Sequence, residues 1–164
     1  QGDWSSDVCS SDLLWKEWML DWLAPRPGQD LIDVAGGTGD IAFEFIKRAK
    51  GSGRAIIVDL TEAMVSEGKK RLEVTNDSST IKWVCGDAMF LPFAQNSFDA
   101  YTISFGMRNV TDIQKALSEA YRILRPGGRL MILEFSKVEN KMLSWLFKNK
   151  KIKVLMKVLV VKKI

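Results

Sequence analysis

Short apolar runs alternate with longer amphipathic stretches along most of this chain. Five of the apolar runs have the length of buried strands, and they span residues 30–35, 55–59, 81–85, 99–105 and 129–135. Three of the longer stretches have helical spacing, and they span residues 40–50, 61–73 and 112–124. Strands that alternate with helices are typical of parallel sheets with crossover connections. The pattern therefore predicts a doubly wound α/β sheet of five strands, with any ligand at the carboxyl ends of the strands.

This periodic region, residues 14–146, is expected to form one domain, and it opens with a helix over 14–23 that Pro25 stops. Residues 1–13 before it are rich in Ser and Asp and show no periodicity. The run DVCSSDL at 7–13 resembles the translation of a sequencing adapter, and a natural disordered arm is the alternative. We therefore expect residues 1–13 to lie outside the fold.

The Lys-rich tail, residues 147–164, is built from only Phe, Asn, Lys, Ile, Val, Leu and Met. On a helix its lysines would spread around the circumference and leave no apolar face. We interpret the tail as non-native or frame-shifted, and a basic segment on a membrane surface is the alternative.

The charge distribution and the missing residue types narrow the function classes. Of the 24 basic residues, eight lysines lie in 141–164, which leaves 16 basic against 20 acidic residues in the rest of the chain. An acidic body argues against a nucleic-acid enzyme. The chain has no histidine, and Cys9 and Cys85 lack the spacing of metal ligands, so we predict no metal site and a reducing compartment. No apolar run reaches the length of a membrane span.

The sequence DVAGGTGD at 33–40 joins the first predicted strand to the helix after it. Gly36, Gly37 and Gly39 let the backbone turn sharply and approach a ligand, and the helix that follows directs free N–H groups at it. A turn selected only for packing is the alternative, and residues 37–42 also fit the dinucleotide pattern G-x-G-x-x-A.

Two acidic residues bear on which ligand this turn holds. Asp33 precedes the glycines, where it can face a cationic amino group, whereas it would repel a pyrophosphate. Asp59 ends the second strand and is placed to accept hydrogen bonds from ribose hydroxyls, which suits either S-adenosylmethionine or a nicotinamide dinucleotide.

Longer strings favour S-adenosylmethionine. The glycine turn, GDAMFLPFAQNSFD at 86–99 and YRILRPGGRLMILEFS at 121–136 together resemble the successive motifs of class I methyltransferases. ISFGMRNVTD at 103–112 and LEFSK at 133–137 resemble the ubiquinone/menaquinone biosynthesis C-methyltransferase family. The resemblance implies a Rossmann-like sheet of seven strands, of which this chain would supply five. The fifth strand would then be an exposed apolar edge.

The same resemblance implies the residues of a cofactor site. Besides Asp33 and the three glycines of the turn, it implies contacts from Thr38, Asp59, Asp87, Ala88 and Ser104. Without the family, Asp87 could equally be a turn residue and Ser104 a strand-end cap.

Methylation of a quinol ring carbon requires a neighbouring hydroxyl to lose its proton, and a fixed cation would favour the phenolate. Arg108 is the candidate for that catalytic role, with pairing to Asp112 as its structural alternative. Asn109 could hydrogen-bond the substrate, but capping of the following helix is the simpler interpretation.

The predicted function is S-adenosylmethionine-dependent C-methylation of a polyprenyl benzoquinol or demethylmenaquinol. A methyltransferase on another small molecule, an NAD(P)-dependent oxidoreductase and a non-catalytic cofactor-binding protein are the alternatives. The resemblance implies a lipid-soluble quinol as substrate and no nucleic acid. It also implies a cytoplasmic or, in a eukaryote, mitochondrial matrix location, with peripheral contact at the inner membrane and a homo-oligomer or quinone-biosynthesis complex left open.

Overall fold

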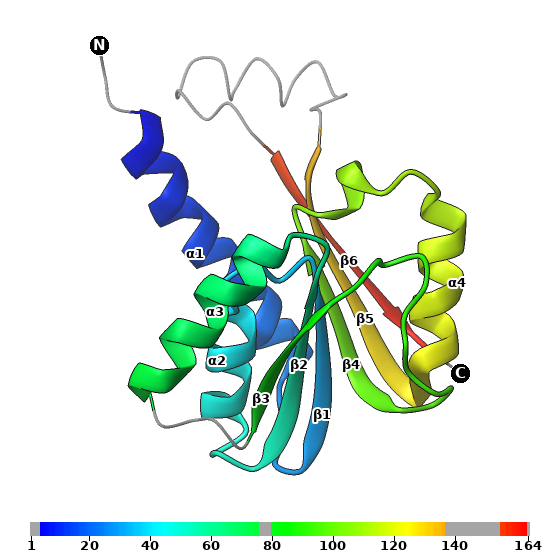
Figure 1. Cartoon of the computed structure of the whole chain (residues 1–164). Helices are drawn as coiled ribbons and strands as arrows, with labels where there is room; N and C mark the ends of the chain where they lie inside the picture. Colours follow the sequence, from blue (N-terminus) through cyan, green and yellow to red (C-terminus); the bar gives the residue numbers. More distant parts are fainter. Residues whose placement is uncertain (1–3, 76–79, 137–154, 164) are drawn as a thin grey trace.

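The computed structural model describes residues 4–75, 80–136 and 155–163, and within these ranges six strands form one sheet with helices on both faces (Figure 1). The strand order is β3-β2-β1-β4-β5-β6. The strands are β1 (Gln29–Val34), β2 (Gly53–Asp59), β3 (Ile81–Cys85), β4 (Phe98–Ser104), β5 (Leu124–Ser136) and β6 (Leu155–Lys162). The helices are α1 (Trp4–Leu23), α2 (Asp40–Arg48), α3 (Glu62–Thr75) and α4 (Ile113–Ile123), with a short 3-10 helix η1 (Met107–Asn109).

The first five strands are parallel, as the sequence pattern predicted. Parallel strands with helices on both sides are buried on both faces, which is why they are continuous apolar runs. In β1, Leu31 and Ile32 are both fully buried, yet each belongs to a different hydrophobic cluster. The doubly wound, Rossmann-like fold class is therefore confirmed.

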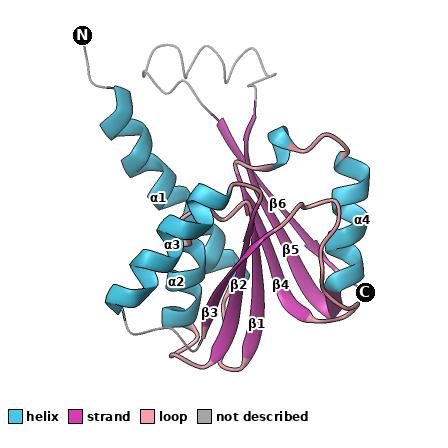
Figure 2. Cartoon of the chain, viewed as in Figure 1, coloured by secondary structure: helices cyan, strands magenta, loops and turns pink. Residues whose placement is uncertain are grey.

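The two hydrophobic clusters correspond to the two helix layers. α1, α2 and α3 cover one face of the sheet, where Met19, Phe45 and Val65 pack against the strands (Figure 2). α4 covers the other face through Ala116 and Ile123. The turn after β1 lies at the carboxyl ends of the parallel strands and leads into α2.

The expectation of an exposed apolar edge at β5 is wrong. β6 pairs antiparallel with β5 from Arg129 opposite Lys162 to Ser136 opposite Leu155. The tail thus supplies a strand where the sequence suggested none, because the open edge of β5 offers unpaired N–H and C=O groups to any extended segment that reaches it. Residues 147–154 of the tail lie outside the described residues, and whether the tail is native stays a prediction.

α1 begins at Trp4, whereas the sequence pattern predicted a helix from Leu14. No Pro or Gly interrupts residues 4–13, so the backbone can continue helical without the apolar periodicity that the prediction relied on. Whether residues 1–13 are native also stays a prediction.

Within the described ranges, no helix is both long enough and apolar enough to cross a lipid bilayer.

Candidate functional site

A cavity of about 460 Å³ lies at the carboxyl ends of β1, β2, β3 and β4. The order of the sheet reverses between β1 and β4, and this is where doubly wound sheets bind their ligands. The cavity is lined by Val34, Ala35, Asp59, Leu60, Thr61, Met64, Gly86, Asp87, Ala88, Met89, Ile103, Ser104, Phe105, Gly106, Asn109, Val110 and Thr111. Its volume and its mixture of apolar walls with a few carboxylates and hydroxyls suit a small organic ligand.

The glycine turn lies beside this cavity and requires an unusual backbone. Ala35, Gly37 and Gly39 all have positive φ, at 53°, 54° and 85°. A side chain on Gly39 would also collide with the Trp83 ring, 2.8 Å from the position of its Cβ. Trp83 Nε1 in turn donates a hydrogen bond to the Gly37 carbonyl at 3.1 Å. Backbone conformation and packing therefore both require glycine here, so the packing alternative is part of the explanation.

Asp59 ends β2, as the strand pattern predicted, and it borders the cavity. Its Oδ2 accepts a hydrogen bond from the Gly37 N–H at 3.0 Å, and its Oδ1 accepts one from the Thr61 N–H at 2.9 Å. These bonds fix the carboxylate between the glycine turn and the start of α3. Each carboxylate oxygen keeps a further lone pair for a ligand hydroxyl.

Asp87, Ala88 and Ser104 also border the cavity. Asp87 Oδ1 accepts the Met89 N–H at 2.8 Å, which is the turn role weighed for this residue. That bond occupies one oxygen of the carboxylate. Ser104 ends β4, and its hydroxyl lies 3.8 Å from Met19 Sδ of α1.

Asp33 lies beneath the glycine turn and does not line the cavity itself. It is 1% exposed, and its Oδ1 accepts the Thr102 hydroxyl at 2.7 Å. Burial raises its pKa to about 7, against the lowering effects of the Thr102 hydrogen bond and of Lys16. Two more acids, Asp40 and Asp59, raise it further.

Thr38 and the three glycines are adjacent in sequence to the cavity wall at Ala35 but are not part of its lining. The Thr38 carbonyl accepts a hydrogen bond from Arg71 at 3.5 Å. A ligand held at the turn would meet these residues through the backbone.

Arg108 does not border the cavity either. Its side chain is 47% exposed and lies 3.6 Å from Glu134 of β5, whereas pairing with Asp112 had been considered. Arg108 Nε also donates to the Phe105 carbonyl at 3.1 Å. Glu134 is 26 residues away in sequence, so only the pairing of β4 with β5 brings the two together.

Asn109 borders the cavity and does not cap α4, contrary to the simpler interpretation of its role. The cap is Asp112, whose Oδ1 accepts the Lys115 N–H at 3.0 Å. Asn109 belongs to the 3-10 helix over residues 107–109, and α4 begins at Ile113.

Several lining residues were not anticipated from the sequence. Leu60 and Met64 both follow Asp59 in the sequence, and they are 72% and 38% exposed. Val110 and Thr111 follow η1. An apolar residue directly after a strand-ending acid was the sequence signal that could have found Leu60.

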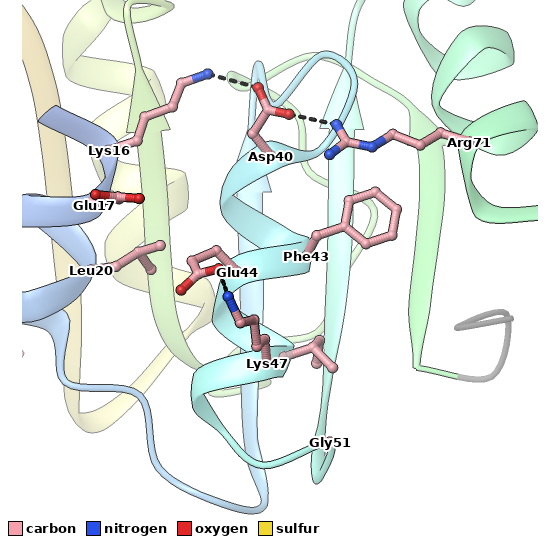
Figure 3. A pocket seen from close by; sticks show the side chains of 10 residues that line it. Lys16, Glu17, Leu20, Asp40, Phe43, Glu44, Lys47, Gly51 and Arg71 are labelled. Atoms are coloured by element: carbon pink, nitrogen blue, oxygen red, sulfur yellow. Dashed lines mark hydrogen bonds and ion pairs between the residues drawn. The ribbon is translucent and has the colours of Figure 1, made fainter. Parts of the chain in front are cut away.

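A second cavity of about 510 Å³ lies among α1, α2 and α3 (Figure 3). Asp40 there binds Lys16 of α1 at 3.1 Å and also pairs with Arg71 of α3, and Glu44 pairs with Lys47. These ion pairs connect the three helices and leave Asp40 and Glu44 already satisfied, so the cavity at the strand ends is the better candidate site.

Comparison with known proteins agrees with this geometry. Residues 3–161 match the ubiE/COQ5 methyltransferase family. The chain is 60% identical over 134 residues to the ubiquinone/menaquinone biosynthesis C-methyltransferase UbiE of Cereibacter sphaeroides (82% of this chain, 53% of the relative). It is 62% identical over 140 residues to the protein of the same name from Roseobacter denitrificans (84% of this chain, 56% of the relative). The chain thus spans a little over half the length of these curated relatives.

The fold is shared with a solved SAM-dependent methyltransferase from Aquifex aeolicus, at a TM-score of 0.70 and 18% identity (91% of this chain, 88% of that one). That structural similarity shows the fold alone, whereas the sequence matches show the protein family. The chain belongs to the ubiE/COQ5 methyltransferase family.

Proposed function

We propose that this chain forms the cofactor-binding core of an S-adenosylmethionine-dependent C-methyltransferase whose substrate is a polyprenyl benzoquinol or demethylmenaquinol. The observation that carries the proposal is the grouping of Asp59, Asp87, Ala88 and Ser104 around one cavity in a chain of this family. Family membership also argues against the oxidoreductase alternative.

The residues present fit the cofactor. Asp59 offers oxygens for ribose hydroxyls beside the glycine turn, and the apolar Leu60 and Met64 can cover a flat base. Asp87 has an oxygen for an exocyclic amino group, and the Ala88 backbone can donate to the ring. Below the turn, Asp33 Oδ2 is buried without a hydrogen-bond partner, which suits a nearby ammonium group.

Catalysis would require this chain to orient the quinol ring and favour its phenolate. When bound, the cofactor supplies a methyl group on a sulfonium, which a ring carbon attacks in line. Phe105, Met89 and Val110 give the cavity an apolar wall that excludes water. Asn109 adds an amide that can hydrogen-bond a ring hydroxyl.

Arg108 is proposed to stabilise the phenolate, a role that requires its guanidinium to turn from Glu134 toward the cavity. Three interactions of the protein stay predictions. They are peripheral contact with a membrane, assembly into a homo-oligomer and membership of a quinone-biosynthesis complex.

The test combines binding and turnover. Calorimetry should show S-adenosylhomocysteine bound and NAD not bound, and methyl transfer to demethylated quinols should exceed transfer to sterols. Binding of NAD alone would refute the proposal.

Replacing Arg108 by Ala should lower kcat by about 10²–10³, the usual effect of removing one stabilising donor, and leave cofactor affinity unchanged. Arg26→Ala, at an exposed arginine on the opposite end of the sheet, is the control. Turnover of Arg108→Ala equal to that of the control would remove Arg108 from the mechanism.

A further inference from the structure

One buried hydrogen bond joins the two central strands directly below the glycine turn. Asp33 of β1 and Thr102 of β4 are register partners, and the Thr102 hydroxyl donates to Asp33 Oδ1 at 2.7 Å. Thr102 is fully buried, and together with Asp30 and Asp33 it makes up the buried polar residues among those the structure describes. A threonine has a single hydroxyl proton, so this bond commits it to the carboxylate.

The other oxygen of Asp33 is left without a partner. Asp33 Oδ2 and the Tyr101 hydroxyl are the two buried side-chain polar atoms that lack a hydrogen bond in the described ranges. Gly36 passes directly over Oδ2, because a Cβ at Gly36 would lie 2.6 Å from that oxygen. Oδ2 therefore lies against the backbone of the glycine turn, where a side chain at Gly36 would collide with it.

The charges around Asp33 act on its pKa in opposite directions. Lys16 of α1 favours the charged form, while Asp40 of α2 and Asp59 of β2 oppose it. Burial disfavours the charged form most strongly, and the result is a pKa of about 7. A bound cation would shift this balance toward the carboxylate, since attraction between opposite charges is strong where water is excluded.

We propose that Thr102 is a positioning residue, which fixes the Asp33 carboxylate so that its free oxygen faces the glycine turn and attracts the ammonium group of the cofactor. This inference rests on the proposed function and deepens it. Thr102 acts through Asp33 and has no contact with the ligand. The hydrogen bond holds one oxygen in place and stabilises the ionised form that the ammonium requires.

Two consequences follow. Affinity for an ammonium-bearing ligand should rise with pH through the range in which Asp33 ionises, because only the carboxylate attracts the ammonium. Losing the Thr102 hydroxyl should move that range to higher pH, because an unbonded buried carboxylate ionises less readily.

The experiment compares two ligands on four proteins. S-adenosylhomocysteine carries the ammonium group, whereas 5′-methylthioadenosine shares its nucleoside and lacks the amino acid portion. The proteins are the unaltered chain, Thr102→Val, Thr102→Ser and Asp33→Asn, each titrated by calorimetry between pH 5.5 and 7.5. The carboxyl resonance of Asp33 is followed by ¹³C NMR in the unliganded proteins.

For Thr102→Val we expect affinity for S-adenosylhomocysteine to fall about tenfold or more at pH 7, in keeping with loss of a hydrogen bond to a charged group. Affinity for 5′-methylthioadenosine should stay unchanged. Thr102→Ser keeps a hydroxyl, so its affinity for S-adenosylhomocysteine and the pH midpoint of its Asp33 resonance should match those of the unaltered chain. Asp33→Asn should bind S-adenosylhomocysteine weakly at every pH.

Two results for Thr102→Val would overturn the inference and leave Thr102 a packing residue. One is an equal loss of affinity for both ligands, and the other is an unchanged pH midpoint of the Asp33 carboxyl resonance. If Thr102→Val does not fold, the unaltered chain decides, because pH-independent binding of S-adenosylhomocysteine there overturns the inference as well. Failure of the unaltered chain to bind either ligand would instead refute the proposed function.

Discussion

Positive φ angles in the turn after β1 have different causes at different residues. Ala35 carries a Cβ at φ 53°, which costs about 1 kcal/mol, and its N–H donates to the Val58 carbonyl at 2.7 Å, which holds it there. Gly39 at φ 85° has no room for a Cβ at all. The spacing of the glycines predicted a turn. Only the packed structure shows which positions require a positive φ angle and which also have no room for a Cβ atom.

Gly39→Ala should therefore destabilise the protein more than Gly51→Ala. Both glycines have positive φ, but a Cβ on Gly51 meets nothing within 4 Å, whereas one on Gly39 meets Trp83 and Ile57 below 3.0 Å. We expect a loss of about 1 kcal/mol in the free energy of unfolding at Gly51 and about 2–4 kcal/mol at Gly39. Urea unfolding of both variants measures the difference, and equal losses would contradict the steric explanation.

Asp33 should also govern how stability depends on pH. Its pKa in the folded protein, about 7, is above the ordinary value of 3.8, so its contribution to stability is complete below 3.8 and is lost as the pH rises through 7. The chain has no histidine to add another transition in this range. We expect the free energy of unfolding to fall by up to about 3 kcal/mol between pH 5 and pH 8.

Asp33→Asn should remove this pH dependence and make the unliganded protein more stable at pH 8, although it weakens cofactor binding. The exposed Glu62→Gln serves as the control. Thermal melts at pH 5 and pH 8 provide the measurement, and a variant that keeps the slope of the unaltered chain would show that another group titrates.

The elements of the fold were largely predictable because their signals are local. The five parallel strands were predicted from runs of apolar residues. Four of them begin and end close to the predicted positions, whereas β5 begins at Leu124 and not at the predicted residue 129. The start of α4 near Asp112 was predicted, but its capping residue was not predictable in the same way, since Asn109 and Asp112 are both good N-caps three residues apart. Likewise, Thr102 pairs with a residue 69 positions away, so strand register had to be known before its role could be recognised.

A cluster of charged residues at the amino ends of the strands should contribute to the stability of the sheet. Arg125 of β5 donates to Asp30 of β1 at 3.1 Å and to Asp99 of β4 at 2.6 Å. Arg54 of β2 donates to the same Asp30 at 2.8 Å. The hydrogen bond from Arg54, with help from Arg125, keeps the pKa of the nearly buried Asp30 below its ordinary value, despite burial.

Arg125→Met keeps most of the aliphatic stem and removes the bridge, so we expect it to lower the free energy of unfolding by about 1–2 kcal/mol. The magnitude is modest because the Arg125 side chain is 37% exposed. Because the pKa of Asp30 is lowered, the difference should be present above pH 3.8 and shrink below it. Arg26→Met is the exposed control, and a loss no larger than that of the control would show the bridge to be energetically neutral.

At the scale of the whole molecule, the sixth strand was the feature that the sequence did not reveal. Local pattern describes β6 poorly, since its lysines interrupt a run of apolar residues without regular alternation. Its formation depends on an unpaired edge at β5, which is a property of the assembled sheet. Lys163, at the end of β6, adds a further link: its ammonium donates to the Tyr121 and Leu124 carbonyls at 2.9 and 2.7 Å, where α4 ends.

The direction of the backbone N–H groups in β6 allows a matched test of this pairing. Lys163 donates its N–H to the Gly128 carbonyl at 2.9 Å, and alternate N–H groups along a strand point the same way. The N–H of Leu159 should therefore face β5, and that of Val160 should face solvent, because β6 is an edge strand.

Leu159→Pro then removes a ladder hydrogen bond and should cost at least about 2 kcal/mol of stability, whereas Val160→Pro should cost less than about 1 kcal/mol. Both variants lose one aliphatic side chain and gain the same ring, and they differ in whether the lost N–H faces β5. With the ladder broken, the apolar edge of β5 becomes available to other chains, and size-exclusion chromatography should show Leu159→Pro to be more oligomeric. If both variants remain as stable and as monodisperse as the unaltered chain, β6 does not contribute to closing the sheet in solution.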